Sequence, residues 1–137
     1  MQAERVLETC LYVDDLQAAA EFYTRVLGLS LLSRVEGRHV FFRCGAGVFL
    51  LFNPATTIQP NNSSRGVPTH GAHGPGHAAF AMPHAEIANW REHLLQNGVA
   101  IEKEINWPGG GYSLYFRDPA GNSLELATPK TWGLASD

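Results

Sequence analysis

The chain has 137 residues, only two cysteines, no long apolar run and no cluster of basic residues. Ten Lys and Arg against 13 Asp and Glu give a formal net charge of -3, so we expect no nucleic-acid partner. A membrane span needs roughly 18 consecutive apolar residues, which no stretch approaches, and the first ten residues contain no apolar leader. We therefore expect a cytoplasmic protein that does not bind membranes.

The two cysteines, Cys10 and Cys44, lie in apolar, strand-like surroundings. A domain of this length needs no disulfide for stability, so we interpret both as buried free thiols. Hydrophobic residues make up 45% of the chain and charged residues 17%, which is typical of a globular protein. The sequence predicts one domain over residues 1–137.

Two segments have helical periodicity. In "VDDLQAAAEFYTRVLG", Asp14 or Asp15 is placed to cap a helix and Gly28 to end it. The segment "PHAEIANWREHLLQNGV" repeats this arrangement, and Asn97 and Gly98 end it. The side chains expected on the buried stripes are Leu16, Ala19, Ala20, Tyr23, Val26 and Leu27 in the first helix, and Ile87, Trp90, Leu94 and Leu95 in the second.

Eight short strand-like segments surround these helices, one before and three after each. The order strand, helix, three strands therefore occurs twice, which predicts an α+β fold of two βαβββ modules at about 4–55 and about 76–130. Between them, about 56–75, the chain is rich in Pro, Gly, Asn, Ser and Thr. Its length and composition indicate a mobile or ligand-covering loop.

Three strands each carry one polar residue among apolar or small ones: Glu8, His77 and Glu125. Alternation of side chains puts Glu8 on the face of Cys10, and Glu125 opposite the apolar face of its strand. Each group is costly to bury alone, and a divalent cation in a cavity shared by the two modules would satisfy all three. The alternatives are a core histidine bonded to a backbone carbonyl and two solvent-exposed strand glutamates.

The stretch "HGAHGPGHAAF" contains three histidines within eight positions. His70 and His73 lie in the Gly- and Pro-rich loop, where side chains are usually exposed, and at most they reach a substrate when the loop closes. His77 alone lies in a strand. The sequence therefore favours His77 as the one metal ligand of the cluster.

The segments "VDDLQAAAEFYTRVLGL" and "YFRDPAGNSLEL" resemble the two hallmark stretches of the vicinal oxygen chelate superfamily. This superfamily includes glyoxalase I, fosfomycin-resistance proteins, extradiol dioxygenases and metal-free bleomycin-resistance proteins. The resemblance implies curved mixed sheets that enclose a metal and a small substrate, with the metal bound by Glu8, His77 and Glu125. It also implies that many members form homodimers.

The same resemblance assigns further residues. Ser113 and Tyr115 match a Ser-x-Tyr that helps fosfomycin-resistance proteins hold substrate, and Cys10 stands where those proteins have threonine. The fourth carboxylate ligand of glyoxalase I falls near Phe49, so no acid is present there. The substrate-binding residues implied are Ser113, Tyr115 and Cys10.

The function implied is a metal-dependent enzyme of glyoxalase type, a lyase or isomerase whose small substrate chelates the metal through adjacent oxygens. Glu125 or Glu8 is the candidate for proton transfer, and Mn, Zn, Ni, Mg or Fe could serve as the divalent ion. Extradiol dioxygenase and fosfomycin-type transferase or hydrolase chemistry are alternatives within the superfamily. A metal-free drug-binding protein of the bleomycin-resistance kind is the alternative from another class.

Overall fold

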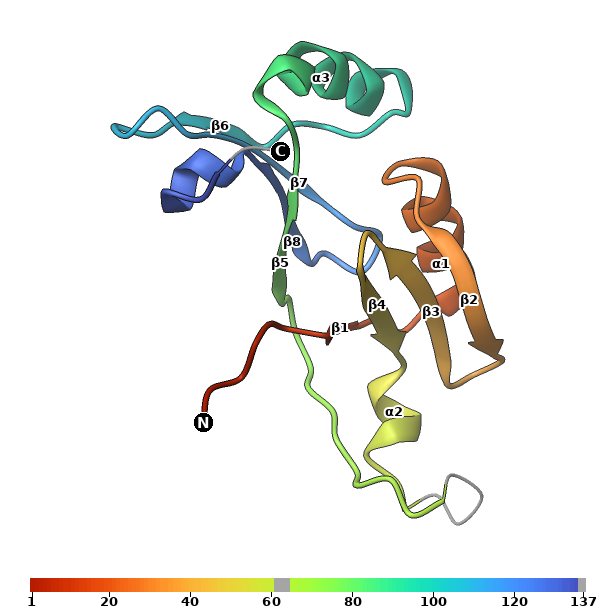
Figure 1. Ribbon diagram of the computed structural model, residues 1–137. Coiled ribbons are helices and arrows are strands. Elements are labelled where there is room, and N and C mark those ends of the chain that lie inside the picture. The colour runs from red at the N-terminus through yellow and green to blue at the C-terminus, as the bar shows by residue number, and fades with distance from the viewer. Residues whose placement is uncertain (61–64, 136–137) are drawn as a thin grey trace. The chain divides into compact units, whose positions relative to one another are not determined.

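A computed structural model describes residues 1–60 and 65–135 of the chain (Figure 1). Residues 61–64, within the predicted loop, and 136–137 lie outside the described residues. The chain divides into two compact units, Met1–Gly74 and Pro75–Asp137. Each unit contains one four-stranded sheet.

The first unit follows the predicted order of strand, helix and three strands. Strand β1 (Glu8–Tyr12) is followed by helix α1 (Leu16–Arg25), and then by β2 (Ser30–Val35), β3 (His39–Cys44) and β4 (Gly47–Phe52). The sheet order is β1-β4-β3-β2, with β1 parallel to β4 and the other pairs antiparallel. A short helix α2 (Pro54–Thr57) begins the segment that we predicted as a loop.

The second unit repeats this topology. Strand β5 (His77–Ala81) precedes the single turn η1 (His84–Glu86) and helix α3 (Ile87–Gln96), and β6 (Lys103–Asn106), β7 (Tyr112–Arg117) and β8 (Ser123–Ala127) follow. The sheet order is β5-β8-β7-β6, and a turn η2 (Pro129–Trp132) ends the unit. The α+β prediction of paired βαβββ modules is confirmed.

Helix α1 has the ends that its sequence predicts. The Asp15 carboxylate accepts a hydrogen bond from the backbone N–H of Ala18 at 3.0 Å, and Gly28 has a positive φ of 66° after the last turn. Tyr23 is fully buried, with its ring 5.3 Å from that of Phe49 and 6.0 Å from that of Phe42. The helix therefore covers one face of the first sheet, and all six residues of its predicted stripe are buried.

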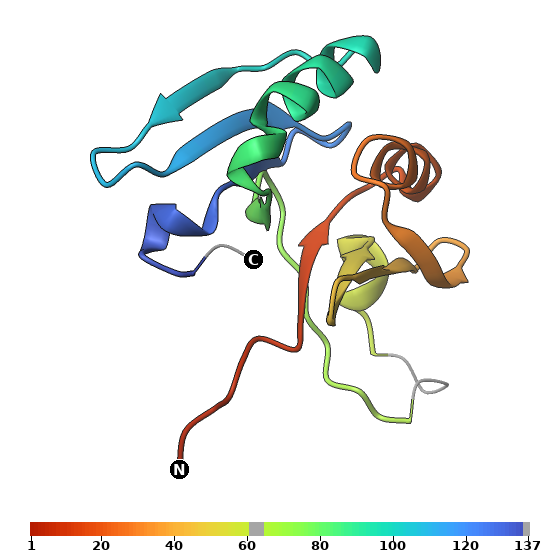
Figure 2. The same cartoon turned by 45° about the horizontal axis from the view of Figure 1, so that its top comes forward.

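Helix α3 lies across the sheet of the second unit (Figure 2) and buries a narrower stripe than predicted. Leu94 is fully buried, whereas Leu95 is 59% exposed, so the prediction for Leu95 was wrong. Successive residues of a helix point about 100° apart, and only one of this pair can face the sheet. The sheet residues buried on the apolar faces of β7 and β8 are Leu114, Phe116, Leu124 and Leu126.

Both cysteines are free thiols, as predicted, but each is half-buried and not fully buried. Burial raises the pKa of the Cys44 thiol. Across residues 1–60 and 65–135, none of the helices is both long and apolar enough to cross a bilayer.

Candidate functional site

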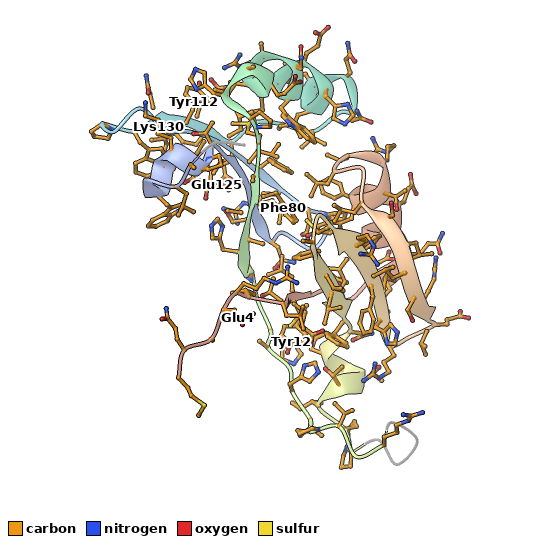
Figure 3. All side chains as sticks on the ribbon, viewed as in Figure 1. Glu4, Tyr12, Phe80, Tyr112, Glu125 and Lys130 are labelled. Atoms are coloured by element: carbon orange, nitrogen blue, oxygen red, sulfur yellow. The ribbon has the colours of Figure 1, made fainter. Side chains whose placement is uncertain are left out.

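The polar face of the second sheet brings His77 and Glu125 together. The strands β5 and β8 are parallel neighbours, and their register pairs His77 with Ser123 and Ala79 with Glu125. His77 Nε2 lies 3.3 Å from Glu125 Oε2. The His77 side chain is 52% exposed and that of Glu125 only 9%, so the pair is open to solvent from the histidine side. Figure 3 labels Glu125, which lies on β8.

The other nitrogen of the His77 ring lies 2.9 Å from the backbone carbonyl oxygen of Ser123. A carbonyl oxygen only accepts, so Nδ1 carries the proton, and in the neutral ring Nε2 then presents a lone pair. That lone pair faces a lone pair of Glu125, an arrangement that requires a proton or a cation. Metal-bound histidines commonly have this kind of outer hydrogen bond.

The separation of the two side chains suits a shared metal ion. For ligand distances of about 2.0–2.2 Å, two ligands of one tetrahedral ion lie about 3.3–3.6 Å apart. The observed 3.3 Å between His77 Nε2 and Glu125 Oε2 falls in this range. The donor pair therefore fits half of a divalent metal site.

Ser113 holds the Glu125 carboxylate in place. Its side chain is fully buried, and its hydroxyl donates to Glu125 Oε1 at 2.5 Å while accepting from the indole N–H of Trp107 at 2.9 Å. We predicted Ser113 as a substrate contact. The structure shows its hydroxyl between Trp107 and Glu125, so its direct partner is the carboxylate.

Tyr115 lies beside Glu125 in the β7–β8 register and is half-buried. Its ring centroid is 6.5 Å from that of His77, at an interplanar angle of 24°. Burial, together with hydrogen bonding to the Glu125 carboxylate, raises the pKa of the Tyr115 hydroxyl. The residue therefore borders the His77–Glu125 pair on the exposed side of the sheet.

The turn before β8 ties the two strands of the pair together. Asn122 is buried, accepts a hydrogen bond from the Gly76 N–H at 2.7 Å, and donates to Asp118 Oδ2 at 2.9 Å. The N–H of Ser123 also donates to the Gly76 carbonyl at 2.9 Å. The sequence indicated a turn here. It did not indicate the hydrogen bond between Asn122 and Gly76, because these two residues are 46 positions apart in the chain.

Glu8 and Cys10 belong to the first unit. Glu8 is exposed at the start of β1, and it shares one face of that strand with Cys10 and Tyr12. Among the described residues, neither unit by itself contains three His, Cys, Asp or Glu side chains close enough to bind a metal ion. The predicted set of Glu8, His77 and Glu125 draws on both units.

The position of the missing fourth carboxylate was predicted near Phe49, on β4. The register places Val48, Leu50 and Phe52 opposite Glu8, Cys10 and Tyr12. Phe49 lies on the other face of β4, against Tyr23 of α1. The positions that do share the face of Glu8 are also apolar, so β4 supplies no acid there.

The loop histidines differ from each other. His73 is exposed, as predicted, whereas His70 is half-buried, because the Tyr12 hydroxyl bonds its Nδ1 at 2.6 Å. Burial raises the pKa of Tyr12 to about 12. The expectation of an exposed side chain was therefore wrong for His70.

The chain belongs to the Glyoxalase/Bleomycin resistance protein/Dioxygenase superfamily, whose family model matches residues 5–126. It is 39% identical to a lactoylglutathione lyase from Agrobacterium tumefaciens of known crystal structure, with a TM-score of 0.93 over 98% of this chain and 100% of that one.

Two curated relatives extend the comparison. Lactoylglutathione lyase from Salmonella typhimurium is 31% identical over 94% of this chain and 96% of its own length. The metallothiol transferase FosB of Staphylococcus epidermidis is 29% identical over 93% and 84%. These likenesses confirm the predicted class, a metal-dependent enzyme of glyoxalase type.

Proposed function

We propose that this chain is a glyoxalase-type lyase whose divalent metal ion is bound by His77, Glu125 and Glu8. The observation that carries the proposal is the 3.3 Å separation of His77 Nε2 and Glu125 Oε2, with Nδ1 of the same ring bonded to the Ser123 carbonyl. Glu8, from the same chain or from a second copy, supplies the third ligand. Its exposure at the start of β1 leaves its carboxylate available.

One imidazole and two carboxylates form an oxygen-rich ligand set that suits Mn²⁺, Zn²⁺, Ni²⁺, Mg²⁺ or Fe²⁺. No acid on β4 shares the face of Glu8, so coordination positions stay open for two adjacent oxygens of a small substrate. When bound, the ion supplies Lewis-acid polarisation of those oxygens.

The protein groups around the pair have separate roles in this proposal. Ser113 holds Glu125 Oε1, so Oε2 is the oxygen that would bind the metal ion beside His77. On leaving the ion, Oε2 would accept and return a proton of the substrate. Glu8 is the second candidate for this proton transfer. Tyr115 lies beside Glu125 on the second sheet, and Cys10 lines the same cavity as Glu8 on the first sheet. Both are the proposed substrate contacts next to the metal ligands.

Lactoylglutathione is the first compound to test, because the relatives with that activity match nearly the whole chain. The assay mixes glutathione and methylglyoxal with the purified protein and follows formation of the thioester. Activity that chelator abolishes and that added metal restores supports the proposal. A fully metallated protein with no turnover would contradict the choice of substrate.

Transfer of a thiol to an epoxide is the second candidate function. It is supported by the likeness to FosB and by the Ser113 and Tyr115 pair beside Glu125. Two assays of the same metallated preparation separate the activities: formation of lactoylglutathione from glutathione and methylglyoxal, and transfer of a thiol to fosfomycin.

We further propose that the chain forms a homodimer. All six residues of β2, an edge strand of the first sheet, are exposed, including Leu31, Leu32 and Val35 at 54%, 47% and 47%. Exposed apolar side chains on an edge strand are typical of an interface. Sedimentation equilibrium tests this, and a monomer at all concentrations would contradict it.

A further inference from the structure

The first unit contains a cavity of about 1280 Å³ on the face of its sheet that α1 does not cover. Strands β1 and β4 line it with Glu8, Cys10, Tyr12, Leu50 and Phe52, and β3 adds His39 and Phe41. Residues Val67 to His70, in the described part of the loop, also line it. Apart from Glu8 and Cys10, these residues have no role in the proposed metal chemistry.

One end of this cavity is built from aromatic rings. The rings of His39 and Phe41 stack at a centroid distance of 3.8 Å, and Phe52 meets Phe41 edge-on at 5.2 Å. The ring of His70 meets Phe52 edge-on at 4.6 Å, and the Tyr12 hydroxyl bonds His70. Five rings from four segments of the chain therefore offer flat apolar surface to a ligand.

Arg38 adds a positive charge at the same end. Its guanidinium carbon lies 5.4 Å from the centre of the Phe52 ring, and its Nη1 donates to His39 Nδ1 at 2.6 Å. His39 Nδ1 is then an acceptor, so Nε2 carries the ring proton and donates to Ser33 at 3.2 Å. The guanidinium is thus held in a fixed orientation.

Arg38 forms no ion pair with a carboxylate in the part of the chain that the structure describes. Arg65 also lines the cavity, and Glu8 is the only acid among the lining residues. A guanidinium over a ring still presents several N–H groups, and a carboxylate accepts two of them at once. This end of the cavity therefore favours an anion.

Glu8 lies at the opposite end. In the strand register, Tyr12, Phe52 and His39 lie side by side across β1, β4 and β3. Glu8 lies beside Val48, four residues before Tyr12 on β1. Four residues of a strand span about 13 Å. A ligand whose reacting oxygens lie near Glu8 would place a group about that far away beside Arg38.

We infer that this cavity binds the far end of the substrate, a planar apolar group that carries a carboxylate, and that Arg38 with the rings of Phe41 and Phe52 determines this specificity. The inference rests on the proposed function for the reacting end at Glu8. The recognition of a planar carboxylate is a property of the first unit alone.

The test is calorimetric titration of the full chain, kept metal-free with EDTA, with phenylacetate, its neutral isostere phenylacetamide, and acetate. Phenylacetate should bind at least about tenfold more tightly than either of the others, because only it combines ring and charge. Arg38→Gln should lower phenylacetate affinity at least about tenfold and leave phenylacetamide binding unchanged. Arg34→Gln is the matched control, because Arg34 bonds Gln17 of α1 on the opposite face of the sheet.

Equal affinity for phenylacetate and phenylacetamide would overturn the role of charge, and equal affinity for acetate would overturn the role of the rings. An Arg38→Gln protein that binds phenylacetate like the wild type would overturn the assignment to this cavity. The comparison of the three probes in the wild-type protein stands even if the variant does not fold. The titration contains no metal, so it is independent of the proposed metal site. If phenylacetate binds as expected but a separate measurement finds no metal binding, the proposed function fails and the carboxylate site stands.

Discussion

The Ser113 hydroxyl donates a 2.5 Å hydrogen bond to Oε1 of Glu125, and both side chains are buried. The indole N–H of Trp107 donates to the same hydroxyl, so the direction of this bond is defined. The result is a carboxylate with one oxygen held by the protein and the other facing His77 at 3.3 Å. This relationship holds the Glu125 carboxylate in a fixed position beside His77.

Ser113→Ala should weaken metal binding by about 10- to 100-fold, as loss of a hydrogen bond to a ligand commonly does. The replacement removes the donor to Glu125 Oε1 and leaves His77 in place. Titration of metal-free protein with Mn²⁺ or Zn²⁺ measures the effect. Ser123→Ala is the control, because His77 bonds the backbone carbonyl of Ser123 and keeps that partner. Equal affinities for the two variants would show that the Ser113 bond does not position Glu125.

Asn122→Ala should lower the free energy of unfolding by about 1–3 kcal/mol. The change leaves the Gly76 N–H and Asp118 Oδ2 without the partner that Asn122 gives each of them. Urea unfolding measures the loss. Because Gly76 precedes His77, metal affinity should fall as well, and an unaltered affinity in the folded variant would contradict a role of this turn in placing His77.

Gly111→Ala should destabilise the protein by about 1–3 kcal/mol through overpacking. An added Cβ at this position would lie 2.4 Å from Thr131 Oγ1 and 2.5 Å from Thr131 Cα. Gly109→Ala, two residues earlier, meets nothing within 4 Å and serves as the matched control. If thermal unfolding shifts equally for both variants, close packing of η2 on Gly111 is not the cause.

The stability of the first unit should fall as pH drops below about 6.5. Burial, and then the charge of Arg38, lowers the pKa of His39 below its ordinary value of 6.5. The unfolded chain therefore binds a proton at a higher pH than the folded chain does, and the free energy of unfolding decreases through that window. Urea unfolding measures the free energy of unfolding at pH 7.5 and at pH 5.5. The difference between the two values should be smaller in His39→Gln than in the wild type, and an identical difference would contradict the role of His39.

Local sequence patterns predicted most of the fold. The eight strands and two helices are present at the expected places, because alternation and helical periodicity are set by neighbours in the chain. All six residues predicted to be buried on α1 are buried, whereas Leu95 of α3, also predicted to be buried, is exposed. The periodicity of a helix does not show how wide a part of it the sheet covers.

The candidate site was predictable only in part. The strand pattern singled out His77 and Glu125 as possible ligands of one metal ion, and the structure brings these two side chains together. The hydrogen bonds of Ser113 to Glu125 and of Asn122 to Gly76 depend on the strand register, which local sequence patterns do not predict. The prediction near Phe49 did not specify a face of β4 for the same reason, since a shift of one residue moves a side chain to the other face.

Metal analysis of protein purified without chelator tests the central claim most directly, with His77→Ala and His73→Ala compared in parallel. The account predicts about one equivalent of divalent ion per chain and a rise in melting temperature on adding metal, both lost in His77→Ala and kept in His73→Ala. His77 is half exposed and His73 lies in the loop, so both variants should fold. Less than about a tenth of an equivalent in the wild type, with no shift from Mn²⁺, Zn²⁺, Ni²⁺ or Fe²⁺, or the same behaviour in both variants, would contradict the account.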